Sequence, residues 1–190
     1  MKRFAILREI PPTLTWDEVD SSAVQNIINM GLTDITPDIA WDPSVIGVKW
    51  IRSYWAQGTD WGLCLYTAES ADNVKAWHDQ CGVAYAGIQE VEEIEGGPVD
   101  YEPGWHKDID ASRLVALEGR ADAMFQEALP LALFAGSTWI RAYVDQRASQ
   151  VFALFTASEP ADPAALMELE AAGWKARRVV EITPGDYIEG

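Results

Sequence analysis

The chain has 190 residues, a hydrophobic content of 48% and a formal net charge of −16. The hydrophobic content is sufficient for a packed core and argues against a disordered chain, while the length allows one large domain or two small ones. The negative charge would repel a phosphate backbone and anionic lipids, so it argues against nucleic-acid and membrane partners.

The first half of the chain alternates strand and helix signals. Thr15 and Glu18 form a capping box that predicts the start of a helix. Two apolar runs on either side of a turn at 57–60 predict a hairpin. The expected elements are, in order, a strand over 4–7, a helix from 15, strands over 48–55 and 63–66, a helix over 71–80 and a strand over 88–92.

The second half repeats this order. Trp50-Ile51-Arg52-Ser53-Tyr54 recurs as Trp139-Ile140-Arg141-Ala142-Tyr143, at an offset of 139 − 50 = 89. A repeat of this kind predicts a duplicated unit. Its expected elements are a strand over 114–117, a helix over 121–134, strands over 139–144 and 151–155, a helix over 163–172 and a strand over 178–182.

The order β-α-β-β-α-β is the ferredoxin-like pattern, an antiparallel sheet with both helices on one face. We therefore predict an α+β protein made of tandem ferredoxin-like repeats that form a pseudo-dimeric α+β barrel, with the barrel interior as the natural pocket. The predicted copies are 1–94, which carries an insertion at 31–47, and 111–190, and the linker between them is 95–110.

Several short motifs of the first copy occur in a characteristic order. They are Gly47-Val48-Lys49-Trp50-Ile51-Arg52-Ser53-Tyr54, then Cys64-Leu65-Tyr66-Thr67-Ala68-Glu69-Ser70, His78 four residues before Gly82, and Ile88-Gln89-Glu90-Val91. In these motifs the copy resembles a small bacterial ferredoxin-like domain family, formerly of unknown function, that has nickel-binding members. The resemblance implies dimer-like packing and binding of nickel or another divalent transition metal.

Three departures affect the implied metal site. The second copy has no histidine corresponding to His78, and Ala153 stands where the first copy has Cys64. The first strand reads Leu7-Arg8 where the family has a Glu-Arg pair. A site that needs one set of ligands from each copy would therefore be incomplete.

Two histidines are the candidate metal ligands. His78 lies in a predicted helix and His106 in the predicted linker, and a neutral imidazole suits nickel, zinc or copper. The alternative is that both are surface residues. Cys64 lies between apolar residues of a predicted strand, which favours a buried thiol, and with Cys81 it forms no CxxC pair.

The repeated strand provides the candidate ligand-binding residues. Strict alternation would place one Trp, one Arg and one Tyr of each copy on a single face: Trp50, Arg52 and Tyr54, and Trp139, Arg141 and Tyr143. If those faces line the barrel, the two arginines could bind an anionic group in an aromatic pocket. The alternative is a salt bridge from each arginine to Glu90 or Glu181.

Three functions remain open from the sequence. The first is a small-ligand or transition-metal binding protein, and the second is a cofactor-free α+β barrel enzyme of the isomerase, cyclase or monooxygenase type that acts on a hydrophobic or aromatic small molecule. The enzyme hypothesis depends partly on fold analogy. The third is an acidic assembly subunit, suggested by nine tryptophans.

The first four residues, Met1 to Phe4, begin no apolar signal stretch. We therefore expect a cytoplasmic protein, and a homo-oligomer is compatible with these hypotheses.

Overall fold

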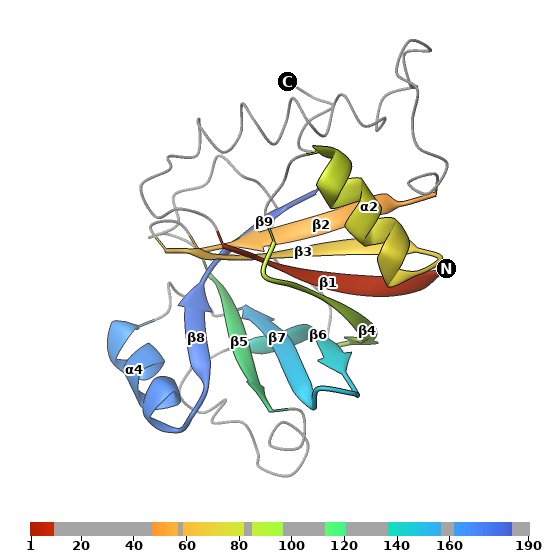
Figure 1. Ribbon diagram of the computed structural model, residues 1–190. Helices are drawn as coiled ribbons and strands as arrows, with labels where there is room; N and C mark the ends of the chain where they lie inside the picture. The colour runs from red at the N-terminus through yellow and green to blue at the C-terminus, as the bar shows by residue number, and fades with distance from the viewer. Residues whose placement is uncertain are drawn as a thin grey trace. The chain divides into compact units, whose positions relative to one another are not determined.

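The computed structural model describes residues 1–9, 47–56, 59–81, 85–96, 113–120, 137–156 and 162–183 (Figure 1). Mostly antiparallel strands and two helices occur in these ranges, which confirms the predicted α+β class. The chain divides into two compact units, Met1–Gln89 with Ile182–Gly190, and Glu90–Glu181. The first predicted helix of each copy, nearly all of the insertion and most of the linker lie outside the described residues.

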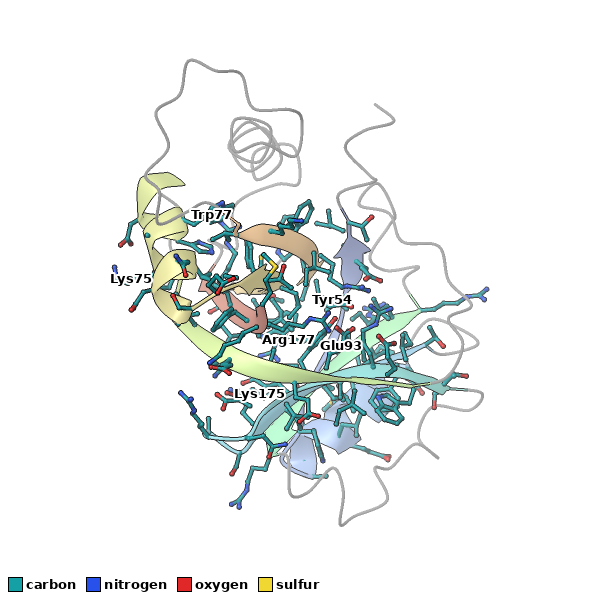
Figure 2. The ribbon with its side chains drawn as sticks, turned by 90° about the vertical axis from the view of Figure 1, so that its right-hand side faces the viewer. Tyr54, Lys75, Trp77, Glu93, Lys175 and Arg177 are labelled. Atoms are coloured by element: carbon teal, nitrogen blue, oxygen red, sulfur yellow. The ribbon has the colours of Figure 1, made fainter. Side chains whose placement is uncertain are left out.

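The first unit contains the strands β1 (Lys2–Glu9), β2 (Lys49–Trp55) and β3 (Trp61–Ala68), with β3 between the other two. Helix α2 (Ala71–Cys81) packs on β3 (Figure 1). Ser70 Oγ accepts a hydrogen bond from Asn73 N and so caps the helix. The buried residues Val74, Trp77 and His78 follow helical spacing, and Figure 2 shows Trp77 on the sheet side and Lys75 on the outer side.

The second unit has the strand order β8-β5-β7-β6-β4. These strands are β4 (Gly87–Glu95), β5 (Leu114–Arg120), β6 (Thr138–Asp145), β7 (Gln150–Thr156) and β8 (Lys175–Arg178). The predicted closing strand over 178–182 is instead two strands, β8 and β9 (Val180–Ile182). The two strands separate at Val179. Strand β8 pairs with β5, and β5 begins at Leu114, whose O accepts a hydrogen bond from Val179 N.

Helix α4 (Pro163–Ala171) confirms the predicted second helix of the second copy. Asp162 accepts a hydrogen bond from Ala164 N at its start, and Pro163 occupies the first turn. At its end Gly173 has a φ of +90°, and Trp174 N donates to Leu169 O. This Schellman ending requires a left-handed residue, which glycine adopts without strain.

The core of the second unit lies between α4 and one face of its sheet. The sheet contributes alternate residues of each strand, and Ala165 and Leu169 of α4 cover them together with Trp174. The sheet residues of this core are Val115, Leu117, Ala142, Val144, Val151, Ala153, Phe155 and Ala176. Because successive side chains of a strand point to opposite sides, the remaining residues of these strands form the other face. We call that other face the second face.

The hairpins of the two units have the same register. Each residue pair between β2 and β3 has a counterpart 89 positions later between β6 and β7; Trp50–Tyr66, for example, corresponds to Trp139–Phe155. The first strands of the two copies correspond with a shift of one residue from the predicted alignment. Phe4 pairs with Tyr66 in the first unit, and in the second unit the counterpart of Tyr66, Phe155, pairs with Val115 and not with Leu114. The duplication and the barrel stay predictions, and the common register supports the duplication.

None of the helices in the described ranges has the length and apolarity that a membrane crossing requires.

Candidate functional site

The second face has an apolar centre with charged residues on both sides of it. Its central residues are almost fully buried: Leu114, Ala116, Tyr143, Phe152 and Leu154. Arg141 and Glu93 lie on β6 and β4, and Glu118, Lys175 and Arg177 lie on β5 and β8 (Figure 2 labels Glu93, Lys175 and Arg177). A mainly apolar environment with a few convergent charged groups is typical of the lining of small-molecule sites, and this face is a candidate on that ground.

The prediction that Trp139, Arg141 and Tyr143 share one face is wrong. The register of β6 against β7 shifts between Trp139 and Arg141, so Ile140 is an extra, bulged residue. The bulge turns Trp139 toward the helix-side core, where it packs, and leaves Arg141 and Tyr143 on the second face. Gly96 N donates to Ile140 O at 2.7 Å, and a Cβ at Gly96 would lie less than 3.0 Å from backbone atoms of the bulge.

The first unit has the same bulge between Trp50 and Arg52. Trp50 Nε1 donates to Ser53 Oγ at 2.9 Å, and Ser53 Oγ donates to Cys64 Sγ at 3.0 Å. These contacts place Trp50 on the face that carries Ser53 and Cys64, so Arg52 and Tyr54 lie on the opposite face. The prediction of a shared face is therefore wrong here too, whereas the predicted burial of the Cys64 thiol is confirmed.

Arg141 is the central charged residue of the second face. Its Nη1 lies 3.9 Å from Glu93 Oε1 and 3.9 Å from Glu181 Oε1, and the three side chains are 9%, 5% and 2% exposed. The ion pair with Glu181 confirms the salt-bridge alternative for Arg141. Glu90, the other predicted partner, lies 3.9 Å from Arg147 Nη2.

Glu93 is a site residue that the sequence reasoning missed. The β4–β6 register places Glu93 opposite Tyr143 and Glu95 opposite Arg141, so Glu93 lies diagonally beside Arg141 on the second face. The alternation of Glu93 with Ile94, which packs on the helix-side core, was the available signal. It could not identify the partner strand, because β4 and β6 are far apart in the sequence.

Two carboxylates of this cluster lie beside one guanidinium. Arg141 Nε is buried, and it has no hydrogen-bond acceptor in the part of the chain that the structure describes. A buried donor left without an acceptor costs about 1–3 kcal/mol. The cluster can therefore donate a hydrogen bond to an added oxygen.

His78 lies in an aromatic environment. It is fully buried, and its ring centroid is 5.4 Å from that of Tyr66, 4.7 Å from that of Trp77 and 5.2 Å from that of Tyr85. This burial contradicts the alternative of a surface histidine. Among the described residues no group of three or more His, Cys, Asp or Glu side chains could hold a metal ion. His106 lies outside those residues, so nickel binding stays a prediction.

The tryptophans that can be placed are core residues. Six of the nine lie in the described ranges, and five of them are buried: Trp50, Trp55, Trp61, Trp77 and Trp174. Trp139 is half-buried against the helix-side core. These six residues form no exposed aromatic surface of the kind that the assembly hypothesis requires.

Comparison with known proteins assigns no family. No protein-family model and no curated protein matches the chain. A solved structure from Lactobacillus acidophilus NCFM, provisionally described as a monooxygenase, aligns over 95% of this chain and 94% of its own at 8% identity, with a TM-score of 0.42. A likeness at this level does not establish a common fold, and the site must be interpreted from its own geometry.

Proposed function

We propose that the chain binds a small, mainly aromatic molecule on the second face of its second unit, and that Arg141 donates a hydrogen bond to an oxygen of this ligand. The buried Arg141 Nε without an acceptor among the described residues carries the proposal. Buried polar groups of folded proteins are nearly always satisfied, so such an atom marks a place for an added acceptor.

The charge of the cluster selects the kind of oxygen. Glu93 and Glu181 already flank the guanidinium, so an anionic ligand at Arg141 would lie close to two carboxylates. A neutral ketone or phenol can accept from Arg141 without adding charge. The surroundings of Arg141 on this face are apolar and partly aromatic, through Tyr143, Phe152 and Leu154, which favours a ligand with an aromatic body. The ligand class is therefore a neutral aromatic carbonyl or hydroxyl compound, not the anion expected from the sequence.

A matched pair of probes tests this selection. We expect 2-acetonaphthone, a neutral ketone, to bind in a calorimetric titration. The probe 2-naphthoate, which has a similar ring but carries a carboxylate, should bind at least about tenfold more weakly, a difference of about 1.4 kcal/mol in binding free energy. Arg141→Met should remove the ketone binding. Arg147→Met is the control, because Arg147 lies in the same unit and forms an ion pair at 3.9 Å, but is exposed. Equal binding of both probes, or equal binding to the two variants, would contradict the proposal.

A second candidate function is cofactor-free acid–base catalysis on the same ligand. It is favoured by the two carboxylates beside Arg141, because a ketone held at the guanidinium would place its α-carbon near a general base. The base would take the α-proton while Arg141 stabilises the enolate oxygen. We expect the protein to speed exchange of the methyl protons of 2-acetonaphthone for deuterium in D₂O, followed by NMR. Binding without faster exchange, or exchange unchanged in both Glu93→Gln and Glu181→Gln, would rule out catalysis and leave the binding proposal intact.

Two finer expectations belong to this proposal. The tandem copies would place the corresponding faces, with Arg52 and Tyr54 of the first unit, inside one α+β barrel, and the common hairpin register supports the duplication. Binding of nickel or another divalent transition metal is a separate proposal that depends on the family resemblance. Titration of metal-free protein with Ni²⁺ tests it, and binding weaker than about 100 μM would exclude it.

A further inference from the structure

The bulge at Ile140 is held by the residue that follows β4. Gly96 N donates to Ile140 O at 2.7 Å, which is at the short end of the range for backbone hydrogen bonds. This bond comes directly after the last pair of the β4–β6 register, in which Glu95 lies opposite Arg141. The pairing of the two strands therefore continues onto the bulged residue instead of stopping before it.

Only a glycine fits this approach of two backbones. A Cβ on Gly96 would lie 2.7 Å from Ile140 O and 2.8 Å from Ile140 C, and closer still to Trp139 O. These are backbone atoms, so they cannot turn aside as the end of a flexible side chain does. At Gly87, the first residue of β4, an added Cβ would meet nothing within 4 Å. The close contact therefore selects glycine at position 96 and not along the whole strand.

Two features of the Arg141 site depend on this contact. The extra residue Ile140 leaves Arg141 on the second face, while Trp139 packs on the helix-side core. The β4–β6 register sets Glu93 beside Arg141, with Oε1 and Nη1 3.9 Å apart. Gly96 follows Glu93 by three residues and binds the carbonyl of the residue before Arg141, so it connects the carboxylate strand to the bulge.

A side chain at position 96 would displace the end of β4 and leave the bulge in place. Strand β6 is also paired with β7 on both sides of the bulge, whereas the register of β4 on β6 covers Glu92–Glu95 and ends just before Gly96. Displacement of this end would move Glu93 away from Arg141. Glu181 approaches the same guanidinium from β9, so its contact should persist.

We propose that Gly96 is a positioning residue of the Arg141 site: it holds the end of β4 against the bulge, keeps Glu93 beside the guanidinium and so sets the preference for a neutral over an anionic ligand. This inference rests on the proposed function, in which Arg141 donates to the ligand. A carboxylate beside the guanidinium disfavours a second carboxylate at the same place, because like charges repel each other. Gly96 acts on this discrimination through Glu93.

The ratio of two dissociation constants, for 2-naphthoate and for 2-acetonaphthone, measures the preference for the ketone. In calorimetric titrations Gly96→Ala should lower this ratio about threefold, because it displaces one of the two carboxylates responsible for the expected tenfold preference. Gly87→Ala, at the other end of β4, is the matched control and should leave the ratio unchanged. A variant that only lost stability would bind both probes more weakly by the same factor, so an unchanged ratio in folded Gly96→Ala overturns the inference.

Double variants show whether Gly96 acts through Glu93. Glu93→Gln alone should lower the preference about as much as Gly96→Ala, and the two changes together should lower it no further, because they remove the same repulsion. Glu181→Gln should instead add its own effect to that of Gly96→Ala, since Glu181 approaches Arg141 from another strand. Full addition of the Glu93→Gln and Gly96→Ala effects would overturn the inference.

The wild-type protein provides a test that does not need Gly96→Ala to fold. Addition of 2-acetonaphthone should shift the NMR resonances of Arg141 Nε and of the Gly96 amide together, because the Gly96 hydrogen bond ends on the carbonyl attached to Arg141 N. The amide of Trp174, which donates to Leu169 O at the end of α4, is the control and should not shift. A shift at Arg141 Nε without one at Gly96 overturns this inference alone. No shift at either position overturns the proposed function and the inference with it.

Discussion

Removal of the Arg141 side chain should strongly destabilise the second unit. At an effective dielectric constant of about 20, each contact of 3.9 Å with Glu93 or Glu181 contributes about 4 kcal/mol of Coulomb attraction. The recovered solvation of the guanidinium offsets part of that attraction. Breaking a buried pair by removing one partner typically costs about 3–5 kcal/mol, and we expect Arg141→Met to cost this much.

The loss should come from the two carboxylates that remain buried together. Adding Glu181→Gln to Arg141→Met removes one of them and should therefore recover part of the stability. Urea unfolding followed by tryptophan fluorescence measures both effects, because Trp139 and Trp174 lie in this unit. Arg147→Met, at an 85% exposed position with one contact at 3.9 Å, should cost at most about 1 kcal/mol. If Arg141→Met costs no more than Arg147→Met, or if Glu181→Gln further destabilises it, the electrostatic account of the cluster is wrong.

Two further predictions concern packing and titration. Gly119→Ala places a Cβ less than 3.0 Å from the buried Trp174 ring and should cost about 1–3 kcal/mol of stability in urea unfolding. The control is Gly87→Ala, whose Cβ meets nothing within 4 Å and which should change stability by at most about 0.5 kcal/mol. Equal effects of the two variants would contradict this packing. The hydrogen bond and charge of Asp79 raise the pKa of Lys75 above 10.5, so this pair stabilises the fold fully below pH 10.5 and loses its effect as the pH rises through the higher folded-state pKa. The NMR titration midpoint of Lys75 should therefore fall in Asp79→Asn, and an unchanged midpoint would exclude the pair.

Local signals in the sequence predicted much of the fold. The hairpins, helix α2 and helix α4 were predictable because their signals are local. Apolar spacing indicates each element, and Pro163 and Gly173 mark the start and end of α4. The repeated motif likewise predicted that β2–β3 and β6–β7 would correspond. Burial of Cys64 was predictable because its neighbours in β3 are apolar.

The candidate site depended on contacts that no local pattern specifies. One bulged residue, Ile140, reversed the face of Trp139 relative to Arg141, because side chains alternate and a single insertion changes the order. Glu93 joined the cluster only through the pairing of β4 with β6, and Glu118 met Lys175 only through the pairing of β5 with β8. The sequence alone predicted most of the described strands and helices, and it offered a carboxylate partner as one of two alternatives for Arg141. Strand register between distant segments decided which carboxylates it meets, because register is a property of the assembled sheet.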